Sequence, residues 1–123
     1  MINYHMIGIT DLPKASTFYD SVLAEIGASR SHNSERYQFY SQGENRPLFA
    51  ICIPYNEDIA TAGNGTMTAL SAPSKEAVHA AYAKAIELGA VCEGAPGPRG
   101  QFGEFAYFRD PDGNKLCVSY LNR

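Results

Sequence analysis

The sequence carries an imidazole near its start, at His5, and a thiol near its end, at Cys117. An imidazole titrates near neutral pH, so His5 is a candidate catalytic base or a hydrogen-bonding group for a ligand. A half-buried histidine satisfied by a neighbouring group is the alternative, and it stays open. A thiol becomes nucleophilic when a nearby cation or helix N-terminus lowers its pKa. His5 is the one evident candidate for that cation, so a structural thiol is the favoured interpretation of Cys117.

Aromatic, hydroxyl and guanidinium groups supply further candidates for ligand contacts. Phe39 and Tyr107 stand in β-rich segments, where they either line a pocket or pack against neighbouring strands. Ser119 shares a strand face with Cys117, because side chains alternate along a strand. Arg99 lies in a stretch rich in glycine and proline, where it either clamps an anionic substrate or stays solvated.

Strands and helices alternate along the sequence and must position these side chains. Apolar residues at three- and four-residue steps predict one helix from Asp11 to Gly27 and another from about Ser74 to Gly89. The stretch 94–103 is expected to be a loop. The carboxylates in DPDGN at 110–114 indicate a tight turn rather than a catalytic pair. Strands are expected at 2–9, 37–41, 48–53, 66–70, 105–108 and 116–121.

The order β-α-β-β-β is predicted twice, in modules at about residues 1–60 and 61–123. A spacing of 62 residues aligns Gly27 with Gly89, and a spacing of 68 aligns Phe39 with Tyr107. These agreements predict a single α+β domain in which two tandem βαβββ modules form a cupped mixed sheet. An ordinary α+β sandwich with chance similarity is the alternative.

The segment HMIGITDL at residues 5–12 and the segment YFRDPDGNKL at 107–116 resemble the vicinal oxygen chelate superfamily. That superfamily includes glyoxalase I, extradiol dioxygenases, and bleomycin- and fosfomycin-resistance proteins. The resemblance spans nearly the whole chain and implies the glyoxalase/bleomycin resistance/dihydroxybiphenyl dioxygenase fold. Function does not follow from that fold, because its members are chemically diverse.

The resemblance also implies a place for a divalent metal ion, held by His on a first strand, His or Gln opening the second module, and Glu on a last strand. His5 matches the first position, Met67 stands 62 residues on, and Cys117 occupies the last-strand position, with Phe49 as its counterpart. A thioether binds hard divalent ions poorly, and residues 115–123 contain no carboxylate side chain. We therefore expect a degenerate metal site, with no cofactor. One divalent metal ion at His5 is the alternative.

Composition excludes several classes of partner. The chain has 123 residues, a net charge of -3 and no basic stripe, which argues against nucleic acid. No apolar run approaches the roughly 20 residues of a membrane helix, and the start lacks the pattern of a signal peptide. Three cysteines without a paired motif favour a reduced, cytoplasmic protein.

These observations predict a small-molecule-binding protein of the glyoxalase/bleomycin-resistance type that forms a homodimer. The pocket is expected to be neutral and to prefer a partly aromatic ligand over a highly charged one. A metal-dependent lyase, isomerase or dioxygenase and a drug-sequestering resistance protein are the alternatives. The predicted ligand contacts are His5, Met67, Cys117, Phe39, Tyr107, Ser119 and Arg99.

Overall fold

Both predicted helices are present in the structure, a computed structural model that describes all 123 residues. Helix α1 spans Leu12–Ala24 and helix α2 spans Lys75–Glu87. The side chain of Asp11 accepts a hydrogen bond from the Lys14 amide at 3.0 Å, and Ser74 accepts one from the Ala77 amide at 3.1 Å. These N-caps satisfy amides that the first helical turn leaves unpaired. Neither helix is long and apolar enough to cross a membrane.

Eight strands form two four-stranded sheets, ordered β1-β4-β3-β2 and β5-β8-β7-β6. In each sheet the first strand runs parallel to the last strand of its module, and the other pairs are antiparallel. The predicted fold of two βαβββ modules is therefore confirmed. The strands are β1 (Tyr4–Gly8), β2 (Ser29–Asn33), β3 (Tyr37–Ser41), β4 (Leu48–Cys52), β5 (Thr68–Ser71), β6 (Val91–Arg99), β7 (Gly103–Arg109) and β8 (Lys115–Leu121).

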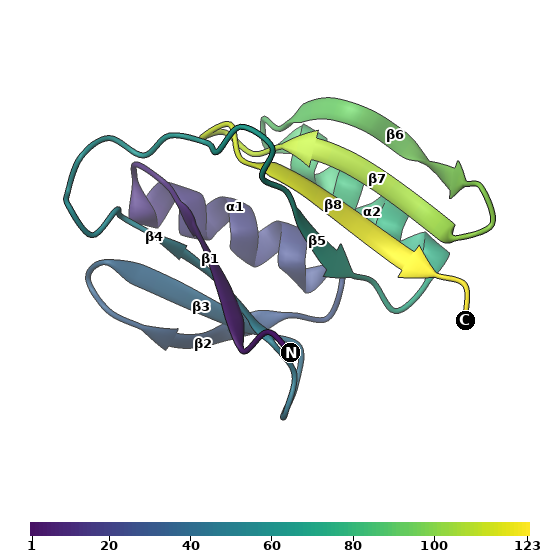
Figure 1. Ribbon diagram of the computed structural model, residues 1–123, viewed down its shortest axis with the longest axis horizontal. Helices are drawn as coiled ribbons and strands as arrows, with labels where there is room; N and C mark the ends of the chain where they lie inside the picture. The colour runs from purple at the N-terminus through teal and green to yellow at the C-terminus, as the bar shows by residue number, and fades with distance from the viewer.

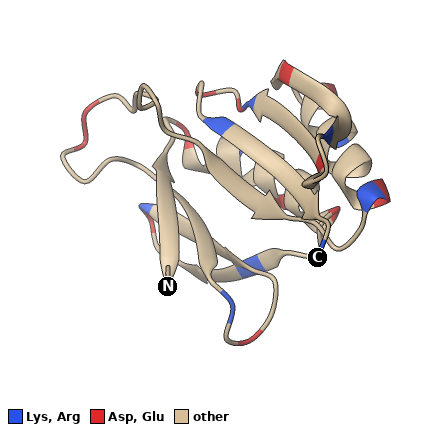
Figure 2. Ribbon diagram, turned by 45° about the vertical axis from the view of Figure 1, so that its right-hand side comes forward, with Lys and Arg blue, Asp and Glu red and all other residues tan.

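The two sheets lie side by side, with β1 and β5 as their facing edges and both helices behind them (Figure 1). We call the gap between β1 and β5 the seam, and the sheet faces turned away from the helices the open face. Charged residues are concentrated in loops and at the ends of elements, and the seam strands carry none (Figure 2). The core lies between the sheets and the helices, and apolar strand residues such as Ile51, Leu116 and Val118 are fully buried there.

Strand β6 overturns the prediction of a loop at residues 94–103 for residues 94–99, and a turn at residues 100–102 connects it to β7. The strand pairs with β7 as the outermost strand of its sheet, and its register shifts twice, between Cys92 and Gly94 and between Gly94 and Gly97. Proline and glycine are tolerated there because an edge strand can leave one row of backbone amides unpaired. Strand β2, also at an edge, was not predicted either. Its sequence SRSHN contains no apolar residue to reveal it.

Candidate functional site

A cavity of about 470 Å³ lies in the seam, between β1 and β5 and beside the C-terminal end of α1. Ten of its 17 lining residues are hydrophobic, and none is acidic. Leu23 in the last turn of α1, Ile26 just after the helix and Phe49 on β4 contribute apolar wall. We call this space the seam cavity.

Two residues that line the seam cavity, His5 and Thr68, each carry a buried polar atom with no hydrogen-bond partner in the protein: Nε2 of His5 and Oγ1 of Thr68. His5 lies opposite Phe49 in the first sheet, and Thr68 lies opposite Leu116 in the second. A buried polar group without a partner costs about 1–3 kcal/mol, so native structures contain few of them. The protein itself therefore leaves hydrogen-bonding capacity unused on both residues.

The loop between β3 and β4 contributes polar residues to the cavity lining. The Gln42 side chain donates to the carbonyl oxygens of Ile26, at 3.0 Å, and Ser71, at 2.7 Å, and so links the two modules across the seam. Arg46 also lines the cavity, is exposed to solvent and makes no ion pair. Sequence reasoning missed Thr68, Gln42 and Arg46, because no local pattern shows that this loop approaches β5.

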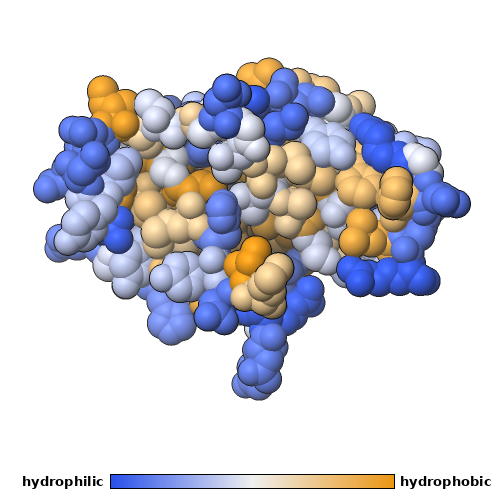
Figure 3. Space-filling view, viewed as in Figure 1, coloured by the Kyte–Doolittle hydropathy of each residue, from blue (hydrophilic) through white to orange (hydrophobic).

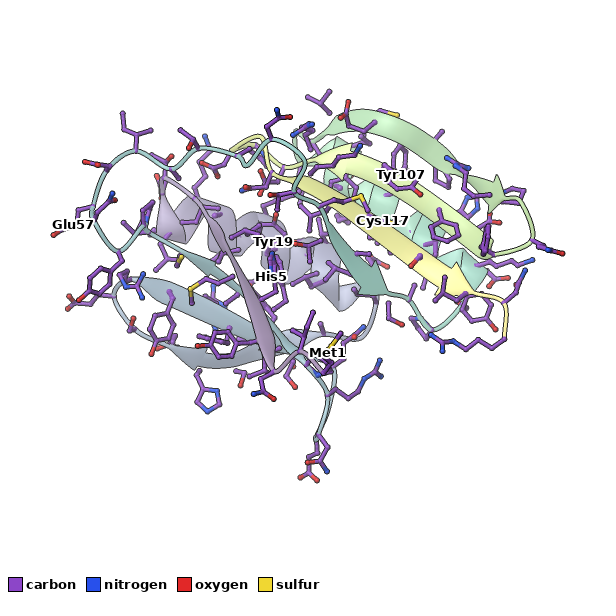
Figure 4. All side chains as sticks on the ribbon, viewed as in Figure 1. Met1, His5, Tyr19, Glu57, Tyr107 and Cys117 are labelled. Carbon is purple, nitrogen blue, oxygen red and sulfur yellow. The ribbon has the colours of Figure 1, made fainter.

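The predicted contact residues do not form one group. His5 and Met67 both line the seam cavity. Figure 4 shows His5 between β1 and β5, whereas Tyr107 and Cys117 lie over the second sheet. The structure thus brings His5 and Met67 together but places Cys117 outside their cavity.

Tyr107, Cys117 and Arg99 form a second group on the open face. Tyr107 lies opposite Cys117 in the β7–β8 ladder, and the Arg99 guanidinium stands 5.6 Å from the centre of the Tyr107 ring. Burial raises the pKa of the Cys117 thiol above its ordinary value, which disfavours the nucleophilic thiolate. Ser119 lies opposite Phe105 on the same face, and it too is buried. None of these four residues lines the seam cavity.

Phe39 belongs to a third group, on the open face of the first sheet. Its ring centre lies 5.4 Å from that of Tyr4 and 5.2 Å from that of Tyr37. Phe39 lies opposite Ala50, one position along β4 from the partner of His5. The expected pocket wall of Phe39 and Tyr107 is therefore divided between the open faces of two different sheets. Ile7, two positions after His5 on β1, is part of the hydrophobic core.

The predicted equivalence of His5 and Met67 is wrong by one residue. Matching the two ladders places His5 with Thr68 and Tyr4 with Met67. The helix N-caps Asp11 and Ser74 are 63 residues apart, and the spacing falls to 62 only after the helices, where Ile26 is an extra residue before Gly27. Side chains alternate between the two faces of a strand, so an alignment wrong by one residue assigns His5 to the opposite face of β1 from the one it occupies.

The same comparison of ladders corrects the counterpart of Cys117. Phe49 matches Leu116, because both lie beside the equivalent aromatic residues Tyr40 and Phe108 of the preceding strand. The counterpart of Cys117 is therefore Ala50 rather than Phe49.

Comparison with known proteins supports the same fold. A sequence profile of the Glyoxalase/Bleomycin resistance protein/Dioxygenase superfamily matches residues 1–118. A glyoxalase/bleomycin resistance protein from Albidiferax ferrireducens T118 is 35% identical, with a TM-score of 0.91 and 99% of each chain covered. The chain belongs to the Glyoxalase/Bleomycin resistance protein/Dioxygenase superfamily.

More distant structures share the fold. A glyoxalase-related enzyme from Fulvimarina pelagi is 18% identical over 98% of this chain and 87% of that one, with a TM-score of 0.75. A family enzyme from Burkholderia phytofirmans PsJN is 19% identical over 98% of each chain, also with a TM-score of 0.75. No curated protein matched the sequence.

The residues of this chain do not fit the divalent metal ion that the superfamily resemblance implies. After the register correction, the four equivalent strand positions hold Tyr4, Ala50, Met67 and Cys117, which include no carboxylate and no imidazole. Nowhere in the chain do three or more His, Cys, Asp or Glu side chains converge as a metal would require. His5 lines a cavity with no acidic residue that could complete a metal-ligand set around it.

Proposed function

We propose that this protein binds a small organic molecule in the seam cavity without the help of a metal ion. The observation that carries the proposal is the pair of buried, unpartnered polar atoms, His5 Nε2 and Thr68 Oγ1, on two residues that line a largely apolar cavity. A ligand that bonds both atoms removes their desolvation penalty, whereas the free protein bears it.

The size and composition of the cavity support a small-molecule ligand. Sites for such ligands typically enclose about 300–1,000 Å³ and are mostly apolar, with a few polar groups that fix orientation. The seam cavity, at about 470 Å³, falls within that range. Arg46 and Gln42 add polar groups to its lining.

A metal-independent lyase or isomerase is the second candidate function. The position of His5 favours it, because an imidazole in a cavity can take a proton from a bound substrate and return it. Turnover separates this candidate from stoichiometric binding, the mode of a drug-sequestering protein. Replacing His5 with Gln would abolish turnover but would only weaken binding.

Plugging the seam cavity tests the proposal. Ala69 and Ser71 line the cavity and are exposed, so Ala69→Trp and Ser71→Trp should fill it without disturbing the core. Compounds from a small-molecule collection that raise the Tm of the wild-type protein should fail to raise that of either plugged variant. The control is Ala83→Trp, at an exposed position of α2, which should respond like the wild type. Compounds that stabilise all four proteins equally would contradict a seam site.

A homodimer with a twofold axis is a separate proposal about partners. Hydrophobic residues gather over both sheets on the open face, with hydrophilic ones around them (Figure 3). Tyr4 is 56% exposed and Leu121 is 40% exposed, which leaves apolar surface for a second copy to bury. Light scattering over a dilution series should give the mass of two chains, and the mass of one chain throughout would contradict the proposal.

A further inference from the structure

We propose that the seam cavity selects molecules with a single negative charge on an apolar body, and that Arg46 binds the anionic group. This inference rests on the proposed binding function and adds the chemical class of the ligand. It differs from the neutral pocket that the sequence predicted.

The charge of the lining supports an anionic ligand. The protein as a whole carries a net charge of -3. Yet the Arg46 side chain lines the cavity, and no Asp or Glu side chain does. An acidic protein thus presents a locally cationic lining, which attracts anions and repels cations.

Arg46 is available for an external partner. The basic side chains in the four ion pairs of the chain are Arg30, His79, Lys84 and Arg109. Arg46 makes no side-chain hydrogen bond within the protein either, so all five of its N–H donors are free. A guanidinium pairs with a carboxylate through two parallel hydrogen bonds, which favours a planar anion over a spherical one.

Arg99, which the sequence left open as an anion-binding or a solvated residue, is engaged instead in holding strand β6. Its guanidinium donates to the carbonyl oxygens of Ala95, at 2.8 Å, and Pro98, at 3.2 Å. It also stands over the Tyr107 ring. These contacts occupy part of its donor set on the open face, away from the seam cavity.

The rest of the cavity defines the other half of the ligand. Leu23, Ile26 and Phe49 supply apolar contact for a hydrocarbon body. His5 and Thr68 can each donate or accept a hydrogen bond, which suits a hydroxyl or carbonyl oxygen on that body. The ligand class is therefore an amphipathic carboxylate rather than an inorganic anion.

A pair of probes of equal shape and different charge tests this inference. Phenylbutyrate carries the carboxylate, and phenylbutyramide replaces it with a neutral amide. Backbone amide chemical shifts in nuclear magnetic resonance would report where each probe binds and how tightly. We expect both probes to shift the amides of Gln42, Thr68 and Ser71, and phenylbutyrate to bind about tenfold more tightly at low salt.

Two arginine variants locate the charge selectivity. Arg46→Gln should abolish the tenfold preference and leave the fold intact, because Arg46 makes no ion pair in the protein. Arg99→Gln, which removes one positive charge from the open face, should preserve the preference.

Each other outcome overturns the inference in a distinguishable way. Equal affinity of both probes at the seam would remove the charge selectivity but leave the proposed binding function standing. Shifts confined to the amides around Tyr107 and Cys117, or no shifts with either probe, would overturn both. A preference lost in Arg99→Gln and kept in Arg46→Gln would place the anion on the open face and refute the role of Arg46.

Discussion

The two modules follow the same backbone path, but their helices contribute differently to the molecule. Helix α1 reaches into the second module: the Tyr19 hydroxyl donates to Asp110 at 2.5 Å, and the Phe18 ring lies 6.5 Å from the Phe108 ring. Helix α2 buries mainly alanine side chains against its own sheet, and Tyr82, at the position equivalent to Tyr19, is partly exposed. The first helix therefore joins the modules, while the second covers one of them.

The polar bonds between the modules are unevenly distributed along α1. Just before α1 begins, Asn114 donates to the Gly8 carbonyl and Asp112 accepts from the Thr10 amide, and near the middle of α1 Asp110 accepts from the Tyr19 hydroxyl. The C-terminal end of α1 borders the seam cavity, where Gln42 provides the bridge. The bonds that join the modules thus run from just before α1 to its middle, and a ligand-sized space lies beside its C-terminal end.

Removing the Asp110 carboxylate should produce the largest loss of stability. One oxygen accepts from the amides of Asp112 and Asn114, and the other accepts from the side chains of Tyr19 and Asn114. Asp110→Ala leaves these donors unpaired in a buried place and should lower the free energy of unfolding by about 3 kcal/mol. Urea denaturation would measure it. Asp112→Ala, which loses the bond to Thr10 alone, should cost much less, and equal losses would contradict the special role of Asp110.

Alkaline pH should weaken the same joint. Burial, followed by the neighbouring Asp110 charge, raises the pKa of Tyr19 well above its ordinary value. The unfolded chain releases this phenolic proton near pH 10, whereas the folded chain retains it, so stability falls as the pH rises above that value. The loss approaches about 1.4 kcal/mol per pH unit. Tyr19→Phe should flatten this slope in denaturation curves. The exposed Tyr55→Phe should leave the slope unchanged, and the same slope in all three proteins would exclude Tyr19 as its source.

At the seam cavity, removing a polar group should raise the free energy of unfolding, whereas removing the Asp110 carboxylate lowers it. Thr68→Val keeps the shape of the side chain and removes the unpartnered Oγ1. We expect the free energy of unfolding to rise by about 1 kcal/mol and phenylbutyrate binding to weaken. The exposed Thr61→Val should change neither quantity. A variant that is both less stable and equally able to bind would show that Thr68 has a structural partner.

Divalent metals should have the smallest effect of all. Zn, Ni, Mn or Fe added to the purified protein should leave its Tm unchanged, because Tyr4, Ala50, Met67 and Cys117 offer no ligand set for these ions. Elemental analysis should find well under one equivalent of any of them. A tight stoichiometric metal that is lost in His5→Gln would refute the metal-free proposal.

Local patterns in the sequence were enough to predict the fold. The caps Asp11 and Ser74, the apolar helix faces and the DPDGN turn each act over a few residues, so they can be read without tertiary information. The repeated order of elements then restricted the architecture to two tandem modules. The edge strands β2 and β6 were missed because pairing with a neighbour stabilises them, whereas their own composition does not.

The site depended on information that is absent from local patterns. One extra residue after α1, Ile26, shifted the alignment of the modules by a single position. A shift of one position exchanges the two faces of a strand, so His5 was paired with Met67, whereas the equivalent pairs are Tyr4 with Met67 and His5 with Thr68. The sequence determined which elements form and in what order. Only the tertiary structure decided that His5, Thr68 and Arg46 line one cavity, because their meeting depends on how two separate sheets are placed beside one helix.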